Sequence, residues 1–249
     1  YDYAGNSSAD LEVWDGAAQA IVVNANKRVL AKAIKVASVS ETFPSESPSF
    51  SVWLRALRVH QWLKNLLLFV PLLAAHQFGN FQSLATLTLA FISFSLCASS
   101  VYIINDLLDL ESDRLHPRKK NRPFASAKLP ISLGVAVAPL LIVSSVTLGA
   151  IVGEDFLVIL LLYLALTVAY SLALKRVVLV DCLTLVTLYT VRIIAGAAAV
   201  SVVLSFWLLA FSVFIFLSLA LLKRYAELKA QIQEGKSSAH GRGYIVSDA

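Results

Sequence analysis

The chain has 249 residues, of which 58% are hydrophobic and only 15% are charged, and its formal net charge is +5. A typical soluble domain carries about 25% charged residues and roughly 45–50% apolar residues. The composition therefore argues against a compact soluble enzyme, a disordered tail and a nucleic-acid-binding module. In so apolar a chain, an excess of basic residues points to an anionic membrane leaflet or an anionic substrate.

The first residue, the absence of methionine and the two cysteines indicate what kind of polypeptide this is. The sequence contains no methionine and begins at Tyr1, so we expect an internal piece of a longer polypeptide, in which no signal peptide can be read. Cys97 and Cys182 both lie inside long apolar runs, which does not indicate a disulfide framework.

The first 39 residues mix polar and apolar side chains and predict a small piece of soluble α/β structure. A β-branched run at residues 20–23 predicts a strand, and the basic stretch 26–36 predicts a helix. Residues 40–52 are rich in Ser, Pro and Glu, as is typical of a linker between domains. Because residues 1–39 are too few to bury a core alone, they are predicted to be the remnant of a larger domain.

From residue 53 onward, the apolar runs reach the length of about 20 residues that a helix needs to cross a bilayer. Residues 53–249 are therefore predicted to form an all-α, multi-span transmembrane bundle. The six predicted spans cover residues 65–75, 84–104, 131–152, 156–174, 177–200 and 206–222. Pro71 interrupts the first span, which is either extended through Trp62 or kinked, with neighbouring helices satisfying the freed carbonyl group.

Basic residues are distributed unevenly between the two ends of these spans. Sixteen of the 21 Lys and Arg residues lie before the first span, between the second and third, between the fourth and fifth, or after the sixth. The other turns between spans contain none. The positive-inside rule therefore places the basic ends on the cytoplasmic side of the membrane.

The segment after the second span carries three carboxylates at regular spacing. Asp106, Asp109 and Asp113 follow the pattern i, i+3, i+7, which places them within about 60° of one another on a helix. Like charges on one helix face repel one another, so we expect a cation to offset them. Oxygen ligands in this arrangement suit Mg²⁺, which bridges carboxylates to substrate phosphates. The alternative is a solvated acidic helix end neutralised by Arg114 and Arg118.

A basic segment, HPRKKNRP at residues 116–123, follows directly. Its cations stand between Pro117 and Pro123 and could grip a polyanion. The same cations could instead anchor the loop to anionic lipid head groups. The residues by themselves leave both interpretations open.

Two charged residues lie in the fifth predicted span. Arg192 follows Asp181 by eleven residues, or three helical turns plus about 20°, so both side chains are expected on one face near Thr184. An arginine inside a membrane is costly and faces a polar cavity or a partner. Arg192 is therefore expected either to meet a phosphate or to form a structural ion pair that ties this span to a neighbour.

The end of the sixth span also mixes charges. Lys223 and Glu227 are four residues apart, so a salt bridge at the helix end is the simple expectation. The alternative is a second clamp for phosphate or metal that faces the first, together with the polar tail that follows.

Taken in order, these segments resemble the intramembrane UbiA-type prenyltransferase superfamily. The NDxxDxxxD signature at residues 105–113 carries the resemblance, which covers roughly residues 53–249. Further segments are similar to the branch that transfers phosphoribose to decaprenyl phosphate: QWLKN at 61–65, HPRKKNRP at 116–123, YSLALK at 170–175 with Asp181, VRIIAG at 191–196 and KRYAEL at 223–228.

The resemblance implies an all-α fold with typically nine spans, of which this chain would hold the first six, and Mg²⁺ at the cytoplasmic mouth of a lipid-open cavity. It implies Mg²⁺ ligands at Asn105, Asp106, Asp109 and Asp113, with Arg192 joining the three aspartates in catalysis. The second acidic motif departs from the DxxxD pattern and would use Glu227, Tyr244 and Asp248. The substrate-binding residues implied are Lys64, Asn105, Arg118, Lys119, Arg122, Lys175, Lys223, Arg224, Glu227, Arg242 and Tyr244.

The first residues have a likeness of their own. The segment YAGNSSADLEVW at residues 3–14, followed by a hydrophobic strand, is similar to the last acidic motif of haloacid-dehalogenase-type phosphatases. The resemblance implies that Asp10 would help to hold Mg²⁺, with Asn6 standing where that family often has an acidic residue. The nucleophilic aspartate of such enzymes would lie before Tyr1, so we expect no phosphatase activity from this piece.

These observations lead to a hypothesis of Mg²⁺-dependent transfer on a polyprenyl lipid, in first place of phosphoribose from phosphoribosyl diphosphate to polyprenyl phosphate. One alternative is prenyl transfer from a diphosphate to an aromatic acceptor in quinone or haem biosynthesis, and another is a non-catalytic membrane transporter or scaffold. We expect a multi-pass protein of the bacterial inner membrane with its acidic motif on the cytoplasmic side. Its expected partners are the bilayer, a polyprenyl lipid and a diphosphate co-substrate, and not nucleic acid. The six-span piece need not be active by itself.

Overall fold

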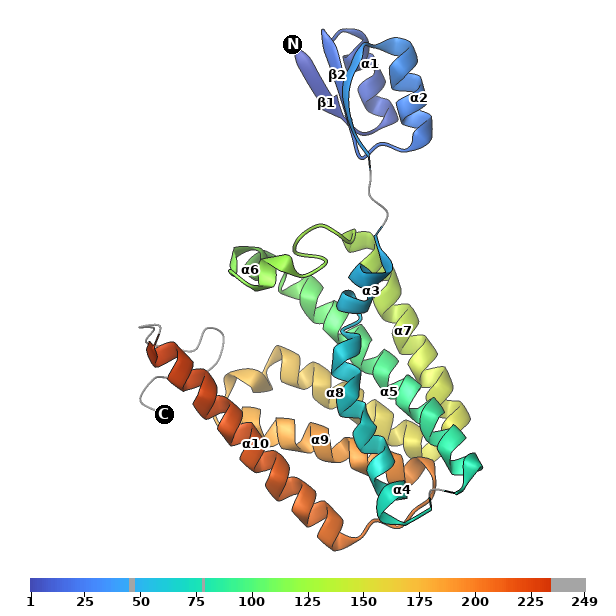
Figure 1. Cartoon of the computed structure of the whole chain (residues 1–249), viewed down its shortest axis with the longest axis vertical. Helices are drawn as coiled ribbons and strands as arrows, with labels where there is room; N and C mark the ends of the chain where they lie inside the picture. Colours follow the sequence, from blue (N-terminus) through green and yellow to red (C-terminus); the bar gives the residue numbers. More distant parts are fainter. Residues whose placement is uncertain (45–47, 78, 234–249) are drawn as a thin grey trace. The chain divides into compact units, whose positions relative to one another are not determined.

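The computed structural model describes residues 1–44, 48–77 and 79–233 (Figure 1). The chain divides into two compact units, Tyr1–Ser49 and Phe50–Ala249.

The N-terminal unit is a small parallel sheet covered by helices. Its elements are β1 (Asp2–Gly5), η1 (Ser8–Asp10), α1 (Leu11–Asp15), β2 (Gln19–Val23), α2 (Lys27–Val36) and β3 (Val39–Phe43), with strand order β1-β2-β3. Trp14 is fully buried at the centre of the apolar core, and its indole N–H donates to the Tyr3 carbonyl oxygen at 3.0 Å. The strand and helix predicted at residues 20–23 and 26–36 are confirmed as β2 and α2.

The predicted linker begins too early. Strand β3 occupies Val39–Phe43 and pairs in parallel with β2, so these residues belong to the sheet and not to the segment between the units. The helical unit also begins before the predicted residue 53, because α3 starts at Phe50. The alternation of β3 was missed because its residues are mostly exposed and include polar Ser and Glu side chains.

The second unit is helical throughout its regular structure. Its elements are α3 (Phe50–Ala56), η2 (Val59–Phe69), α4 (Val70–Ala74), α5 (Phe81–Leu108), α6 (Leu110–Leu115), η3 (Lys119–Asn121), α7 (Ile131–Val152), α8 (Glu154–Leu172), η4 (Leu174–Arg176), α9 (Val180–Ala199) and α10 (Phe206–Gln233). Five of these, α5 and α7 to α10, are long and apolar enough to cross a membrane. They coincide with the second to sixth predicted spans, which confirms the all-α, multi-span fold class.

The first predicted span takes a different form. Residues Val59–Ala74 form a shorter apolar segment, in which eleven residues of 3₁₀ helix η2 are followed by five residues of α4. A 3₁₀ helix rises about 2.0 Å per residue and an α-helix about 1.5 Å, so this segment extends about 30 Å, close to the thickness of a bilayer's hydrocarbon core. Pro71 lies at the start of α4, directly after η2, and has no N–H to donate to the preceding turn.

Helices α5 and α9 form the interior of the bundle. Over their apolar windows, 61% of α5 and 56% of α9 is buried, against 11–17% for α7, α8 and α10. At Gly196 on α9, an added Cβ would lie only 2.0 Å from the Leu68 carbonyl oxygen, so glycine is what lets η2 lie directly on α9. Ser93 and Ser145 exchange hydrogen bonds between α5 and α7. Close backbone approach and paired hydroxyl groups are how helices associate where no water drives them together.

Candidate active site at the end of α5

The three aspartates of the predicted motif lie where α5 gives way to α6. Asp106 is in the last turn of α5, Asp109 stands at the junction, and Asp113 is in α6. Asp106 and Asp113 are almost fully buried and bind the same arginine, so the structure brings these two together. Among the residues that the structure describes, no three His, Cys, Asp or Glu side chains are grouped so as to hold one metal ion. The structure thus assembles a pair of carboxylates and does not add Asp109 to it.

Asp106 and Asp113 are bridged by Arg122. One guanidinium nitrogen of Arg122 lies 3.1 Å from Asp106 Oδ1 and 2.5 Å from Asp113 Oδ2. Lys119 Nζ lies 3.8 Å from the other oxygen of Asp113. Basic neighbours therefore offset these carboxylates, as in the alternative of a neutralised acidic helix end, but Arg122 and Lys119 do so in place of the expected Arg114 and Arg118. Lys119 and Arg122 were predicted as substrate ligands. Arg118 is exposed, and its backbone N–H donates to the His116 ring.

Arg58 is a member of this site that sequence reasoning missed. Its guanidinium donates to Asp106 Oδ1 at 2.6 Å and lies 4.7 Å from the centre of the Tyr102 ring. Its backbone is left-handed, with φ of 52°, at the junction between α3 and η2. In the sequence, Arg58 is one of the basic residues before the first predicted span, and the 48 residues that separate it from Asp106 carry no local signal of the contact. Non-glycine residues held at positive φ concentrate at functional sites.

The carboxylate pair fits the demands of Mg²⁺. Asp113 Oδ1 is buried and accepts no hydrogen bond, so a lone pair there remains open to a ligand. Mg²⁺ is usually held by one or two carboxylates together with water and substrate phosphates, so two aspartates suffice. Asn105, also predicted as a ligand, is oriented by its side-chain amide, which donates to Ser171 Oγ on α8 at 2.9 Å.

Arg192 lies in the interior of the bundle and has neutral partners. Its Nε donates to Asn65 Oδ1 at 2.9 Å, a terminal nitrogen donates to the Tyr163 hydroxyl at 2.9 Å, and the other bonds the Leu188 carbonyl oxygen. The guanidinium lies 4.9 Å from the centre of the Tyr163 ring. Every described hydrogen-bond partner of this buried cation is thus uncharged, which leaves its charge available to an anion.

Asp181 and Arg192 do not act as a pair. Asp181 is fully buried and forms an ion pair with Arg224 of α10, through both of its carboxylate oxygens. The Tyr170 hydroxyl from α8 donates to Asp181 Oδ1 at 2.7 Å. Arg224 also bonds Glu227 at 2.5 Å, three residues later, so Glu227 pairs with Arg224 where a bridge to Lys223 was expected. The common helix face of Asp181 and Arg192 did not decide their partners, because neighbouring helices supply them.

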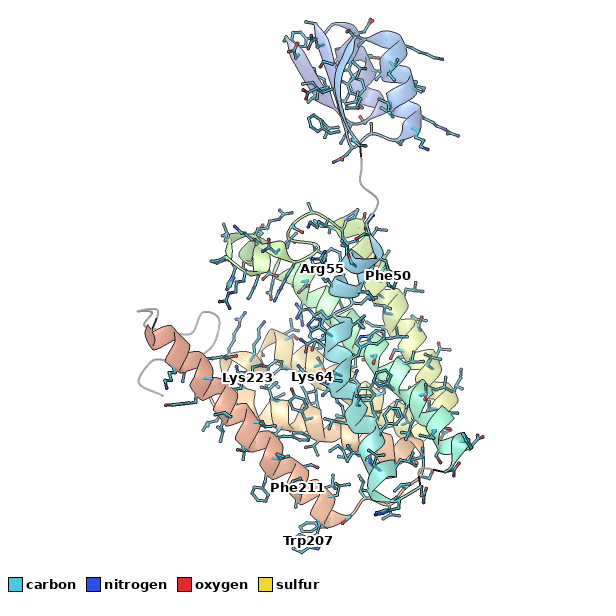
Figure 2. All side chains as sticks on the ribbon, in the orientation of Figure 1. Phe50, Arg55, Lys64, Trp207, Phe211 and Lys223 are labelled. Atoms are coloured by element: carbon cyan, nitrogen blue, oxygen red, sulfur yellow. The ribbon has the colours of Figure 1, made fainter. Side chains whose placement is uncertain are left out.

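The remaining predicted substrate residues are spread over several elements. Lys64 lies in η2, Lys175 in η4 and Lys223 in α10. Figure 2 shows Lys64 and Lys223 at a similar level of the helical unit. The predicted Arg242, Tyr244 and Asp248 lie outside the described residues.

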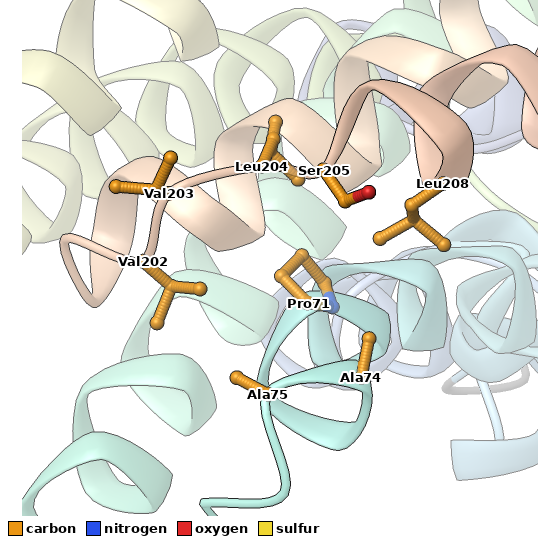
Figure 3. A pocket seen from close by; sticks show the side chains of 8 residues that line it. All are labelled: Pro71, Ala74, Ala75, Val202, Val203, Leu204, Ser205 and Leu208. Atoms are coloured by element: carbon orange, nitrogen blue, oxygen red, sulfur yellow. The ribbon is translucent and has the colours of Figure 1, made fainter.

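An apolar pocket lies away from these charges. It has a volume of about 90 Å³ and is formed where the start of α10 passes α4 (Figure 3). Its lining residues are Pro71, Ala74, Ala75, Val202, Val203, Leu204, Ser205 and Leu208. Its lining side chains are uncharged and mostly apolar, so this pocket is not the site of the charged residues described above.

In the N-terminal unit, Asp10 is engaged by its own loop. One carboxylate oxygen accepts from the backbone N–H groups of Asn6 and Ser7, both at 2.8 Å, and the other accepts from the Tyr3 hydroxyl. The backbone N–H groups of Ser7 and Asn6 lower the pKa of Asp10 below its usual range, because they stabilise the ionised form. Asp10 therefore shapes the loop that follows β1, at the end of the sheet where parallel strands commonly present their ligands.

Comparison with known proteins identifies relatives of this chain. The sequence profile of the UbiA prenyltransferase family matches residues 66–239. The chain is 37% identical to the "Uncharacterized protein y4nM" of Sinorhizobium fredii, over 99% of this chain and 48% of that protein. It is 41% identical to the nodulation protein NoeC of Azorhizobium caulinodans, over 80% of this chain and 64% of that protein. It is 36% identical to decaprenyl-phosphate phosphoribosyltransferase of Mycobacterium tuberculosis, over 70% of this chain and 59% of that protein.

These relatives are longer than this chain, which spans between about half and two thirds of their length. Among solved structures, the chain resembles a UbiA homolog from Archaeoglobus fulgidus bound to GPP and Mg²⁺, with a TM-score of 0.60 and 19% identity. The match covers 74% of this chain and 66% of that one, and it shows a common fold. The chain belongs to the UbiA prenyltransferase family.

Proposed function

We propose that this chain is part of a membrane transferase that moves phosphoribose from phosphoribosyl diphosphate to polyprenyl phosphate. The observation that carries the proposal is that the helical unit has two different charged sites. One is the buried Arg192, whose described hydrogen-bond partners are all neutral, and the other is a carboxylate pair suited to Mg²⁺. Two separate anion sites fit a reaction in which both substrates carry phosphate. The similarity to relatives named decaprenyl-phosphate phosphoribosyltransferase supports the same choice.

The donor is proposed to bind at the end of α5. Asp106 and Asp113 would hold the Mg²⁺, which would offset the charge of the donor diphosphate and so favour its departure. Asn105 and Asp109 are proposed as further ligands, although among the described residues the structure groups only the first two carboxylates. Arg58, Arg122 and Lys119 already lie at these carboxylates, and they would also be in place to bind the diphosphate oxygens. Fixed cations around a group on which charge develops lower the barrier to its departure. The predicted Arg118 and Lys175 would add to this positive field from the neighbouring loops.

The acceptor phosphate is proposed to meet Arg192. One of its oxygens attacks C1 of the ribose, the bond between C1 and the diphosphate oxygen breaks, and the diphosphate leaves with the electron pair. Because the attacking oxygen is already anionic, no side chain has to remove a proton. Tyr163 and Asn65 hold the guanidinium of Arg192 in place while it orients the acceptor. The polyprenyl chain would lie in the bilayer against exposed apolar side chains of the helices.

The proposal also includes an orientation of the protein in the membrane. The acidic and basic residues gather at ends of the spans that the positive-inside rule assigns to the cytoplasm, where a soluble donor would be met. The bilayer is proposed to be a bacterial inner membrane. For the N-terminal unit, a parallel sheet with Asp10 beyond β1 supports the proposal that it is the last part of a haloacid-dehalogenase-type phosphatase domain.

A transfer assay separates the candidate reactions. Membranes that contain the protein, with whatever sequence flanks it, are supplied with polyprenyl phosphate and labelled phosphoribosyl diphosphate, with and without Mg²⁺. The proposal expects label in the lipid fraction only when Mg²⁺ is present. The solved homolog bound to GPP makes prenyl transfer the second candidate. A parallel reaction therefore contains labelled prenyl diphosphate and an aromatic acceptor. Label in the aromatic acceptor, with none in the lipid phosphate from phosphoribosyl diphosphate, would establish that alternative, whereas no transfer from either donor would favour a transporter or scaffold.

A further inference from the structure

Asn65 of η2 connects Arg192 of α9 to helix α5 through a chain of buried hydrogen bonds. The Nε–H of Arg192 donates to Asn65 Oδ1 at 2.9 Å, and the side-chain amide nitrogen of Asn65 donates to Ser95 Oγ at 3.0 Å. Arg192 is 6% exposed, Asn65 is 1% exposed and Ser95 is fully buried. Water therefore has little access to this chain, and its polar groups have to satisfy one another.

The chemistry of the three side chains dictates which way round the amide stands. A guanidinium carries donors only, so the Asn65 atom that faces Arg192 has to be the carbonyl oxygen. The amide nitrogen then faces the other way, where its buried N–H groups need an acceptor. Among the described hydrogen bonds, the Ser95 hydroxyl is the acceptor that meets this nitrogen. Ser95 therefore holds the amide in the orientation that Arg192 requires.

The 3₁₀ form of η2 is what brings Asn65 to Ser95. Three residues before Asn65, the indole N–H of Trp62 donates to Ser99 Oγ at 3.0 Å, so a step of three along η2 matches a step of four along α5. Three residues of a 3₁₀ helix advance about 6 Å, and so do four residues of an α-helix. In an α-helical η2 three residues would advance only about 4.5 Å, and the two contacts would not align.

Helix α9 meets η2 with a similar spacing. Gly196 follows Arg192 by four residues on α9, and Leu68 follows Asn65 by three residues on η2. The missing side chain of Gly196 leaves room for the Leu68 carbonyl group directly beside it. The backbones of η2 and α9 are thus in contact one turn beyond the hydrogen bond between Asn65 and Arg192. Asn65 therefore stands between two helices, α9 and α5, and bonds a side chain of each.

We propose that Ser95 is a positioning residue: by accepting the hydrogen bond of the Asn65 amide, it holds Oδ1 on the Nε–H of Arg192 and so sets the direction in which the guanidinium meets the acceptor phosphate. The other two nitrogens of the guanidinium bond Tyr163 and Leu188. This inference rests on the proposed function for the identity of the anion. Ser95 lies two hydrogen bonds away from the guanidinium, so it acts through Asn65 alone.

The hydrogen-bond chain can be tested without any substrate. The protein, with whatever sequence flanks this chain, is labelled with ¹⁵N at arginine and placed in lipid nanodiscs. The Nε–H signal of Arg192 is identified by its loss in Arg192→Met, and its rate of exchange with deuterated water is measured by magnetic resonance. We expect slow exchange in the wild type and exchange about tenfold faster in Ser95→Ala, because Asn65 then no longer holds its oxygen on this group. Ser95→Thr keeps the hydroxyl group and should restore slow exchange.

Ser99→Ala is the matched control. Ser99 is also fully buried, lies one turn further along α5, and also bonds η2 and its flank, through Trp62 and the Leu57 carbonyl oxygen. The control should leave the exchange of the Arg192 Nε–H within about twofold of the wild type. Equal acceleration in both serine variants would mean that any loosening of η2 frees Arg192, which would overturn the specific role of Ser95. If Ser95→Ala does not fold, Ser95→Cys takes its place, because a thiol has a similar volume and is only a weak acceptor.

Steady-state kinetics test the step from Arg192 to the acceptor. With polyprenyl phosphate varied, Ser95→Ala should raise the acceptor KM about three- to tenfold and leave the donor KM and kcat unchanged. Added to Asn65→Leu, Ser95→Ala should change the acceptor KM by less than about twofold, because its route to Arg192 is already broken. A merely structural role of Ser95 would lower the amount of active enzyme, and so kcat, in both backgrounds, and that result would contradict the proposal.

The outcomes also separate this inference from the proposed reaction. Unchanged exchange of the Arg192 Nε–H in the Ser95 variant overturns the inference, whichever reaction the protein catalyses. Faster exchange with an unchanged acceptor KM would show that the hydrogen-bond chain does not set acceptor binding, and it would overturn the functional part. Faster exchange together with no transfer from phosphoribosyl diphosphate would remove the proposed reaction and leave Ser95 as the residue that positions Arg192.

Discussion

The two charged regions of the helical unit are built in opposite ways. At the end of α5, Asp106 and Asp113 are paired with arginine, so the charges there neutralise one another within the protein. In the interior, Arg192 is held by an amide oxygen, a hydroxyl group and a backbone carbonyl, none of which offsets its charge. On the proposed function, the first region would have to exchange partners on binding Mg²⁺ and a diphosphate, whereas the second would already be arranged for an anion.

This difference has an energetic consequence. Removing a charge from water costs desolvation free energy, which a well-formed ion pair offsets at the end of α5. Around Arg192 the neutral hydrogen bonds and the faces of Tyr163 and Tyr189 offset only part of that cost. A bound phosphate would offset the remainder, so on the proposed function an anion would bind most favourably at the interior site.

The largest effect is expected from removing the carboxylates. Asp106→Asn together with Asp113→Asn should lower the rate of Mg²⁺-dependent transfer by about 10² to 10³ or more, because the metal loses its charged ligands. Initial rates over a Mg²⁺ titration measure this. Glu111→Gln is the matched control, since Glu111 is an exposed carboxylate of the same segment and should have wild-type rates. A double variant as active as the control would exclude a metal role for this pair.

The next largest effect is expected at Arg192. Arg192→Met keeps much of the side-chain volume and removes the charge, so the KM for polyprenyl phosphate should rise about 10- to 100-fold while the KM for the donor changes little. Steady-state kinetics with each substrate varied in turn measure this, and the exposed Arg114→Met serves as control. If the donor KM rises instead, Arg192 belongs to the diphosphate site and the two regions are not functionally separate.

A smaller and divided effect is expected at Arg58. Arg58→Met removes one cation from Asp106, so half-maximal activity should need a few-fold less Mg²⁺, whereas the donor KM should rise about tenfold because the diphosphate loses a contact. Arg55→Met, in the exposed last turn of α3, is the control (Figure 2). Changes of both constants in the same direction would show that Arg58 does not exchange between the carboxylate and the donor.

The smallest effect is expected from Tyr163→Phe. The variant keeps the ring beneath Arg192 and removes only the hydroxyl that accepts its hydrogen bond, a loss of about 1 kcal/mol or a few-fold in acceptor KM. The exposed Tyr225→Phe is the control. No change in acceptor KM, with Arg192→Met strongly impaired, would mean that the neutral hydrogen bonds do not position the guanidinium.

Much of the helical fold could be predicted from apolar length. The predicted span 131–152 coincides with α7, because the hydrophobic run and the helix both begin after Pro130 and end before Gly153. Helix α10 continues to Gln233, beyond the predicted residue 222, because a helix can persist through polar residues after it leaves the apolar region. The 3₁₀ conformation of η2 had no such signal, since an apolar segment interrupted by polar residues is compatible with either kind of helix.

The candidate site was predictable only in part. Spacing along one helix drew attention to Asp106 and Asp113, and local charge drew attention to Lys119 and Arg122. Which cation meets which carboxylate could not be read from spacing, because Arg58 lies 48 residues from Asp106 and Arg224 lies 43 residues from Asp181. These pairs depend on the way that separate helices pack.

The sequence by itself determined that the chain is a multi-span helical membrane protein with a basic and acidic end, because hydrophobic length and charge are properties of each segment alone. The pairing of the charges was decided only by the tertiary structure. It set Arg122 between two aspartates, left Arg192 among neutral groups and tied α10 to Asp181, because buried charges find partners across helices whose neighbours no single segment specifies.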